Sequence, residues 1–321
     1  MRSLLVITAC FFSGAFYAIG QNHTTGIRLF ESGKYDEAFT QFSSVKKGSG
    51  EYAESRYYMG LISLRRRESD KAEEYTEQAI DANGNVAKYH LSMINILGQQ
   101  ASGASTLKQA SIATRIKSHM ESAARLDPKD INSRTMLIQF YVRAPKMMGG
   151  DIDKARKTAD EISKINSAEG YRAHATIDQA EEKWAEAERN FQRAMNLAPD
   201  SLKHYTTLAS FYQSRSNPEQ AFSVYDRAMA KFPANRNLLM QAGRLASSSG
   251  PKYHDRGIRH LNKYIADTPN KADRSLANAY YYLGVIEQGK KNNTAARNHF
   301  NAALKINPEH RQAQKSIGDM K

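Results

Sequence analysis

The sequence has almost no cysteine and few of the residues that interrupt helices. Its single cysteine, Cys10, lies in an apolar amino-terminal stretch, so the rest of the 321-residue chain has none. This excludes a disulfide framework, a thiol nucleophile and a cysteine-ligated metal from that remainder. Only eight prolines occur, and no low-complexity linker separates domains. We therefore expect one continuous architecture over residues 21–321.

Catalytic motifs are also lacking. The sequence contains no Gly-rich phosphate loop, no H-E-x-x-H motif and no G-x-S-x-G turn. The nine histidines are scattered singly. Those inside helical patterns, such as His90 and His119, are expected to pack rather than to bind a metal. The sequence therefore predicts that the protein is not an enzyme and has no cofactor and no metal site.

The only long apolar run is at the amino terminus. Arg2 precedes Leu4–Ile7, and the small residues Ala18–Gly20 precede Gln21. This pattern is typical of a secretory signal peptide over residues 1–20. It predicts export, to the periplasm of a Gram-negative bacterium. The alternatives are an inner-membrane anchor formed by residues 4–20 and full secretion.

The most informative feature present is a spacing of 34 residues. A set of four residues recurs at similar positions 34 residues later. The first set is Ala187, Phe191, Ala194 and Pro199, and the second is Ala221, Tyr225, Ala228 and Pro233. A fixed period of this length predicts one helical unit stacked repeatedly. The punctuation agrees, because Asn217 and Pro218 are suited to begin a helix that Pro233 ends.

One stretch carries a family signature: Tyr280-x-x-Leu283-Gly284, Ala296-x-x-x-Phe300, Ala303 and Pro308. This closely resembles the tetratricopeptide repeat (TPR) pattern. The resemblance implies an all-α fold, an α-solenoid (TPR superhelix) of about eight antiparallel helix pairs with a cap helix over residues 311–320. The expected repeats cover residues 22–50, 53–84, 85–128, 131–167, 168–201, 202–235, 236–270 and 277–310.

Two segments depart from the repeat. Residues 98–111 add about a dozen positions before an expected helix over 112–126, and residues 144–150 lengthen a turn. The second, Ala-Pro-Lys-Met-Met-Gly-Gly, resembles a segment of some exported bacterial TPR proteins. Asp151 is expected to cap the helix after it. Met147 and Met148 either offer an adaptable contact surface or fold back onto neighbouring helices.

In TPR proteins the first helix of each pair lines a concave groove. The resemblance places these residues there: Tyr57, Leu61, Tyr89, Met93, Gln139, Arg143, Arg172, Thr176, Gln179, Ser210, Gln213, Met240, Arg244, Tyr281 and Gln288. The early positions are apolar and aromatic, whereas the middle ones could bond an extended peptide backbone. The same positions also fit ordinary surface or inter-repeat packing.

The function expected from this pattern is a non-catalytic adaptor or scaffold of the bacterial cell envelope that binds a protein or peptide segment in the groove. The contacts with the greatest expected role are Tyr57, Tyr89, Gln139, Arg172, Gln179 and Arg244. Either Arg172→Ala or Arg244→Ala is expected to weaken the ligand without unfolding the chain. An Asn-Lys clamp for chaperone tails is not inferred, because Leu61, Met93, Thr176, Ser210 and Val285 occupy its places.

The charge supports a second hypothesis. The formal net charge is +13, and sixteen Lys and Arg face five acids between Arg227 and Lys315, a net of +11. Such a region suits a polyanion or an acidic membrane surface, although solvated helix faces would look the same. We expect no specific nucleic-acid partner. A third hypothesis is a non-catalytic subunit of an envelope enzyme complex.

Overall fold

The computed structural model describes residues 13–270 and 272–320, with side chains from residue 22 onward. Within these residues all regular secondary structure is helical, and there is no strand. Residues 1–12 of the expected signal peptide lie outside the described residues, and the first helix begins at Ser13. No helix in the described part combines the length and the apolar character that crossing a membrane requires.

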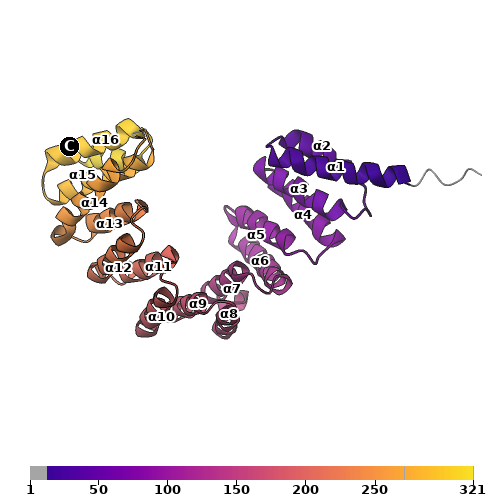
Figure 1. Ribbon diagram of the computed structural model, residues 1–321, viewed down its shortest axis with the longest axis horizontal. Helices are drawn as coiled ribbons and strands as arrows, with labels where there is room; N and C mark the ends of the chain where they lie inside the picture. Colours follow the sequence, from indigo (N-terminus) through magenta and orange to yellow (C-terminus); the bar gives the residue numbers. More distant parts are fainter. Residues whose placement is uncertain (1–12, 271, 321) are drawn as a thin grey trace, which may run out of the picture. The chain divides into compact units, whose positions relative to one another are not determined.

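The chain divides into two compact units, residues 1–181 and 182–321. In the first unit each helix packs against the next one along the chain (Figure 1). The first helices of neighbouring pairs also touch, as α7 touches α9. The helices are α1 (Ser13–Glu31), α2 (Tyr35–Ser43), α3 (Tyr52–Arg65), α4 (Ser69–Ala82), α5 (Ala87–Ala101), α6 (Thr106–Leu126), α7 (Ile131–Arg143), the short η1 (Lys146–Met148), α8 (Ile152–Ile165) and α9 (Ser167–Ala180).

The second unit repeats this packing. Its helices are α10 (Trp184–Leu197), α11 (Leu202–Ser214), α12 (Pro218–Lys231), α13 (Asn237–Ser248), the short η2 (Pro251–Tyr253), α14 (His254–Ala266), α15 (Ser275–Gly289), α16 (Asn293–Ile306) and α17 (Arg311–Asp319). Both units are stacks of helix pairs joined by short turns, which is the architecture of an α-solenoid. The boundary between the units falls inside the expected repeat 168–201, between α9 and α10.

Capping residues fix where the helices of a pair begin. The Asn217 side chain accepts a hydrogen bond from the Gln220 amide at 3.2 Å, and Pro218 occupies the first turn of α12. Ser216, between the two helices, has φ of 53°. This left-handed conformation is unfavourable for a residue with a Cβ atom, and it turns the chain sharply enough for α12 to fold back on α11.

Small residues of the first helix lie against large residues of the second. A Cβ atom at Gly284 of α15 would be 2.4 Å from Cε1 of Phe300 on α16, and one at Gly243 of α13 would be 2.4 Å from Cγ of Leu261 on α14. Phe300 and Leu261 are fully buried. The glycines of the repeat pattern therefore leave the volume that the partner's large side chain fills.

The extra residues 98–111 lengthen helices rather than form a loop. Helix α5 continues to Ala101 and α6 begins at Thr106, six residues before the expected start at Ile112. The turn between them uses Gly103, whose φ is 100°. Ile112 packs with Met93 and Leu97 in one buried cluster. The added part of α6 is held as helix by this packing against α5.

Two histidines meet between α5 and α6. His90 Nδ1 lies 2.9 Å from His119 Nδ1, and His90 Nε2 lies 3.1 Å from the Gly84 carbonyl oxygen. A carbonyl can only accept, so His90 carries its proton on Nε2 and its Nδ1 accepts from His119. Burial, and to a smaller extent the positive charge of Arg115, lowers the pKa of His119 to about 4.

This pair gives a pH-dependent stability. The unfolded chain takes up the His119 proton near pH 6.5, whereas the folded chain takes it up only near pH 4. The free energy of unfolding therefore falls between these values as the pH decreases. Because His119 is only half-buried, solvent screening reduces its contribution to this decrease to about 1–2 kcal/mol. The free energies of unfolding of wild type and His119→Gln, measured in urea at a series of pH values, should differ by a constant above pH 7 and converge toward pH 4. Parallel curves down to pH 4 would contradict the shifted pKa.

Candidate functional site

The structure places three of the expected groove residues in the core. Met93 is fully buried against Leu97 and Ile112. The Tyr89 ring is also buried, with its centre 5.1 Å from that of Tyr57. Met93 and Tyr89 are therefore packing residues between helices, which corrects the expectation that they contact a ligand.

Arg172 is the third of these residues. Only 9% of its surface is exposed. Its Nε donates to Glu169 at 2.6 Å and its Nη2 donates to the Thr135 hydroxyl at 3.4 Å. The guanidinium group is thus engaged within the unit, and Arg172→Ala would remove an internal ion pair. Arg172 holds α9 against α7 and is not a groove contact.

The aromatic end of the expected groove already surrounds a cation of the chain itself. Lys88 Nζ lies 5.1 Å, 6.0 Å and 5.8 Å from the ring centres of Tyr57, Tyr58 and Tyr89, and it pairs with the Glu54 carboxylate. Burial raises the pKa of Tyr89 to about 12. The Lys88 ammonium group covers the aromatic rings, so Tyr57 is less available than the sequence suggests.

In the second unit some of the expected groove residues are engaged in contacts within the unit, and the others are exposed. Gln213 donates to the Tyr225 hydroxyl at 2.9 Å, and this hydroxyl donates to Gln241 at 3.2 Å. Tyr281 packs against Phe300, with ring centres 5.9 Å apart, and Met240 packs on the α13–α15 core. The exposed members are Ser210, Arg244 and Gln288.

Gln139 and Arg143, one helical turn apart on α7, are exposed beside a cavity of about 480 Å³. In residues 13–270 and 272–320, neither side chain makes a hydrogen bond or ion pair. The cavity lies among α6, α7 and the turn that follows α7. Its lining comprises Gln109, Ala113, Met120, Met136, Gln139, Phe140, Arg143, Ala144, Pro145 and Met148. We call this the methionine pocket.

The turn over residues 144–150 forms one wall of the methionine pocket. Gly150 N donates to the Pro145 carbonyl at 3.1 Å, and Asp151 N donates to that of Tyr141 at 3.0 Å. A Cβ atom at Gly150 would be 1.8 Å from the Ala144 carbonyl oxygen, so only glycine fits. Met148 is half-buried in the pocket wall, whereas Met147 is 94% exposed. Of the two alternatives for these methionines, Met148 thus folds back and Met147 does not.

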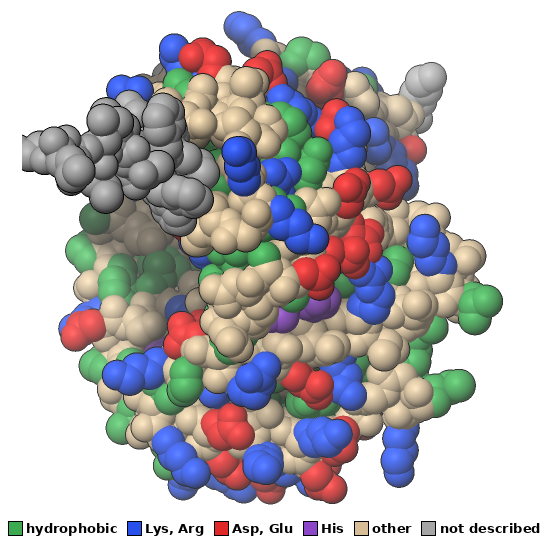
Figure 2. Space-filling view, turned by 90° about the vertical axis from the view of Figure 1, so that its right-hand side faces the viewer, with side chains coloured by type: hydrophobic (Ala, Val, Ile, Leu, Met, Phe, Trp, Pro, Cys, Tyr) green, Lys and Arg blue, Asp and Glu red, His purple; other side chains and the backbone are tan. Residues whose placement is uncertain are grey.

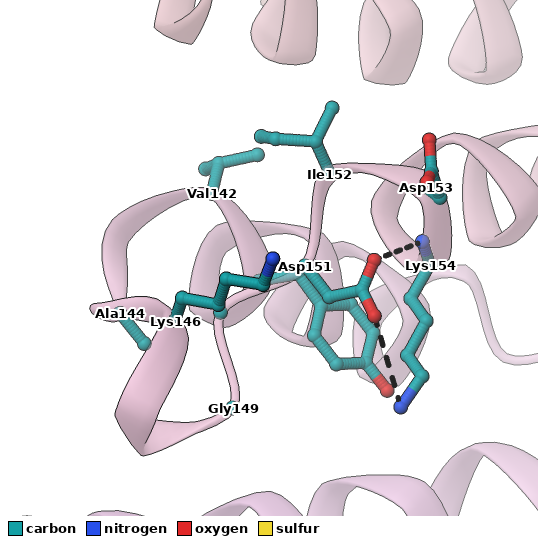
Figure 3. A pocket seen from close by; sticks show the side chains of 10 residues that line it. Val142, Ala144, Lys146, Gly149, Asp151, Ile152, Asp153 and Lys154 are labelled. Atoms are coloured by element: carbon teal, nitrogen blue, oxygen red, sulfur yellow. Dashed lines mark hydrogen bonds and ion pairs between the residues drawn. The ribbon is translucent and has the colours of Figure 1, made fainter.

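A second cavity, of about 720 Å³, lies on the α8 side of this turn. Figure 3 shows the Asp151 carboxylate between the backbone amide and the ammonium group of Lys154, at 3.0 Å and 3.9 Å. Asp151 therefore caps α8 as expected. The other charged groups in the lining are Lys146 and Asp153. Two cations and two anions leave this cavity without a preference for the charge of a ligand.

Internal ion pairs use part of the charge in the basic region. Six described basic residues between 227 and 315 pair with acids. Three of those acids, Asp200, Glu219 and Asp226, precede the region. On the side of the molecule that Figure 2 shows, which is the right-hand side of Figure 1 and carries α1 to α4, cationic and anionic side chains are also interspersed. In the part of the chain that the structure describes, no three His, Cys, Asp or Glu side chains are grouped to hold a metal ion.

The comparisons with known proteins concern the fold. No family model matches the chain, and no curated protein matches its sequence. A tetratricopeptide repeat protein from Parabacteroides merdae is similar over 95% of this chain and 99% of that chain, with 13% identity and a TM-score of 0.50. YrrB, a TPR protein with an unusual peptide-binding site, is similar over 62% of this chain and 97% of its own, with 17% identity and a TM-score of 0.42.

Human IFIT1 in complex with m7Gppp-AAAA is similar over 92% of this chain and 70% of that chain, with 15% identity and a TM-score of 0.49. The likeness to the Parabacteroides protein spans nearly the whole chain and agrees with the stacked helix pairs described above. It confirms the resemblance found in the sequence: this protein has the tetratricopeptide-repeat fold, an α-solenoid of paired helices.

Proposed function

We propose that the protein is a non-catalytic adaptor of the bacterial cell envelope that binds a segment of another protein. The observation that carries the proposal is the methionine pocket. It joins a half-exposed apolar surface to two polar side chains, Gln139 and Arg143, that have no partner among the described residues. An apolar cavity with a few directed polar groups is the usual form of a binding site.

The position of the pocket also supports binding of a segment rather than of a small molecule. It is bounded by two helices and a turn, and Met147, the chain neighbour of the lining residue Met148, is 94% exposed. A segment that extends beyond the pocket would have this exposed apolar side chain of the same turn to contact. The envelope location rests on the amino-terminal sequence, where residues 1–20 have the features of a signal peptide.

The second candidate is binding of a polyanion or membrane surface through residues 227–315. It is favoured by exposed cations such as Arg244, Arg259 and Lys305. In the described part of the chain these three side chains make no ion pair. The pairing of six other cations with acids reduces the local positive charge, so we rank this candidate second.

Affinity capture at two salt concentrations separates the candidates. The full-length chain, tagged at its carboxyl terminus and expressed in its host, is captured from envelope extract at about 50 mM and about 500 mM salt. Binding to a charged surface weakens steeply over this range, whereas apolar recognition does not.

We expect one or a few proteins to remain at high salt and to bind the purified chain directly. Acidic polymers or lipids that are lost at high salt would favour the second candidate. Co-purification of a stable enzyme complex would support a subunit role.

A further inference from the structure

We propose that the methionine pocket receives a large apolar side chain from a peptide that also carries a carboxylate nearby, and that Arg143 binds this carboxylate. The proposal rests on the adaptor function and specifies the chemistry of its ligand. It concerns the site at the turn over residues 144–150, where the chain departs from the regular repeat.

The apolar half of the ligand follows from the pocket lining. Met120, Met136, Phe140 and Met148 are each only half-buried, so all four keep apolar surface that a ligand would remove from water. Burying apolar surface contributes about 25 cal/mol for each Å². Methionine side chains are flexible and polarisable and adapt to ligands of different shape. The pocket is therefore suited to large apolar side chains as a class, such as Leu, Met and Phe.

The anionic half follows from the charge. Arg143 is the one charged residue in the pocket lining, which contains no carboxylate. Its guanidinium group is exposed and makes no hydrogen bond or ion pair with any described residue. A guanidinium group can bind a carboxylate through two parallel hydrogen bonds. The complementary ligand is an acidic side chain or a free carboxyl terminus.

Gln139 is positioned to form hydrogen bonds with the backbone of the bound peptide. It lies four residues before Arg143 and therefore on the same face of α7. Its amide can both donate to and accept from a peptide group. By contrast, the nearby Gln109 amide already donates to the Ala104 carbonyl at 3.0 Å. A polyanion without apolar groups would leave the methionine surface uncovered, so a mixed apolar and acidic segment fits the pocket better.

The test uses a phage-displayed library of random linear peptides, selected against the full-length chain. We expect enriched peptides to combine Leu, Met or Phe with a nearby Asp, Glu or free carboxyl terminus. For one synthetic peptide, Arg143→Gln and replacement of the peptide carboxylate by its amide should each weaken binding about tenfold. The two changes together should weaken it no further, because they remove the same contact.

Charge reversal and a matched control complete the test. Selection against Arg143→Glu should enrich Lys and Arg in place of the acid. Arg125→Gln changes an exposed arginine of α6 that is not part of the pocket lining and should leave the peptide affinity unchanged. Melting curves would confirm that all three variants are folded.

Several outcomes would overturn the proposal. Peptides that bind equally well to Arg143→Gln would place the peptide site elsewhere and leave the adaptor function standing. Failure to enrich any peptide would reject the assignment of this pocket, while envelope capture would decide the adaptor function separately. A dimer that dissociates on Arg143→Glu would show that the pocket binds a second copy of the chain.

Discussion

The variant Ala228→Glu is expected to unfold its part of the second unit. Ala228 lies on α12 and is fully buried. A glutamate there would carry an unpaired carboxylate into a packed interface between helices, which costs more than about 4 kcal/mol. Because each repeat of a solenoid contacts only its neighbours, the loss should be centred on α11 to α13. Urea unfolding followed by far-UV circular dichroism and by fluorescence of the single tryptophan, Trp184, would measure it.

The matched control for this variant is Ala230→Glu. Ala230 lies two residues further along the same helix and is exposed, so the same substitution should change the unfolding free energy by less than about 0.5 kcal/mol. Both variants place the same residue in the same helix, so helix propensity affects them alike. The difference between their unfolding free energies therefore measures the effect of burial. If Ala228→Glu melted together with the wild type, the face assigned to α12 would be wrong, and the assignment of the repeat with it.

The helix pairs could be predicted from the sequence because their cause is local and periodic. Ala221, Tyr225 and Ala228 are all buried on one face of α12, as the spacing of three and four residues requires. Pro218 and Asn217 begin that helix by capping chemistry that depends on neighbouring residues alone. Features of this kind recur in each repeat, so one well-formed repeat allows the weaker ones to be located.

The binding surface could be predicted only in part. The first helix of a pair in the middle of a stack contacts several neighbouring helices. The pattern of apolar and polar residues along such a helix therefore does not distinguish a groove residue from a packing residue. Met93, for example, is buried against Leu97 of its own helix and Ile112 of α6. The Arg172 ion pair was visible in the sequence, since Glu169 precedes it by three residues. The sequence pointed to Gln139, Arg143 and Met148 separately, but not to the methionine pocket that they share, because its walls come from three separate segments.

Arg134 is a residue whose role the sequence did not indicate, and its removal should destabilise the first unit strongly. Its guanidinium group is buried, with 7% of the residue exposed. Nη1 donates to the carbonyl oxygens of Asp127 and Asp130, and Nη2 donates to that of Ala124, each at 3.0 Å. Nε donates to Glu161 of α8 at 3.3 Å. One side chain thus satisfies the end of α6 and joins it to α7 and α8.

Arg134→Ala should lower the free energy of unfolding by about 3–4 kcal/mol, because buried carbonyl groups lose their donors and a cavity forms. Arg134→Lys should recover little of this loss, since one ammonium group cannot reproduce the planar arrangement of five donors. Arg125→Ala, at an exposed position of α6, is the control and should be nearly neutral. Urea unfolding would measure all three variants. Full recovery by lysine would mean that positive charge alone, rather than the geometry of the guanidinium group, holds the three helices together.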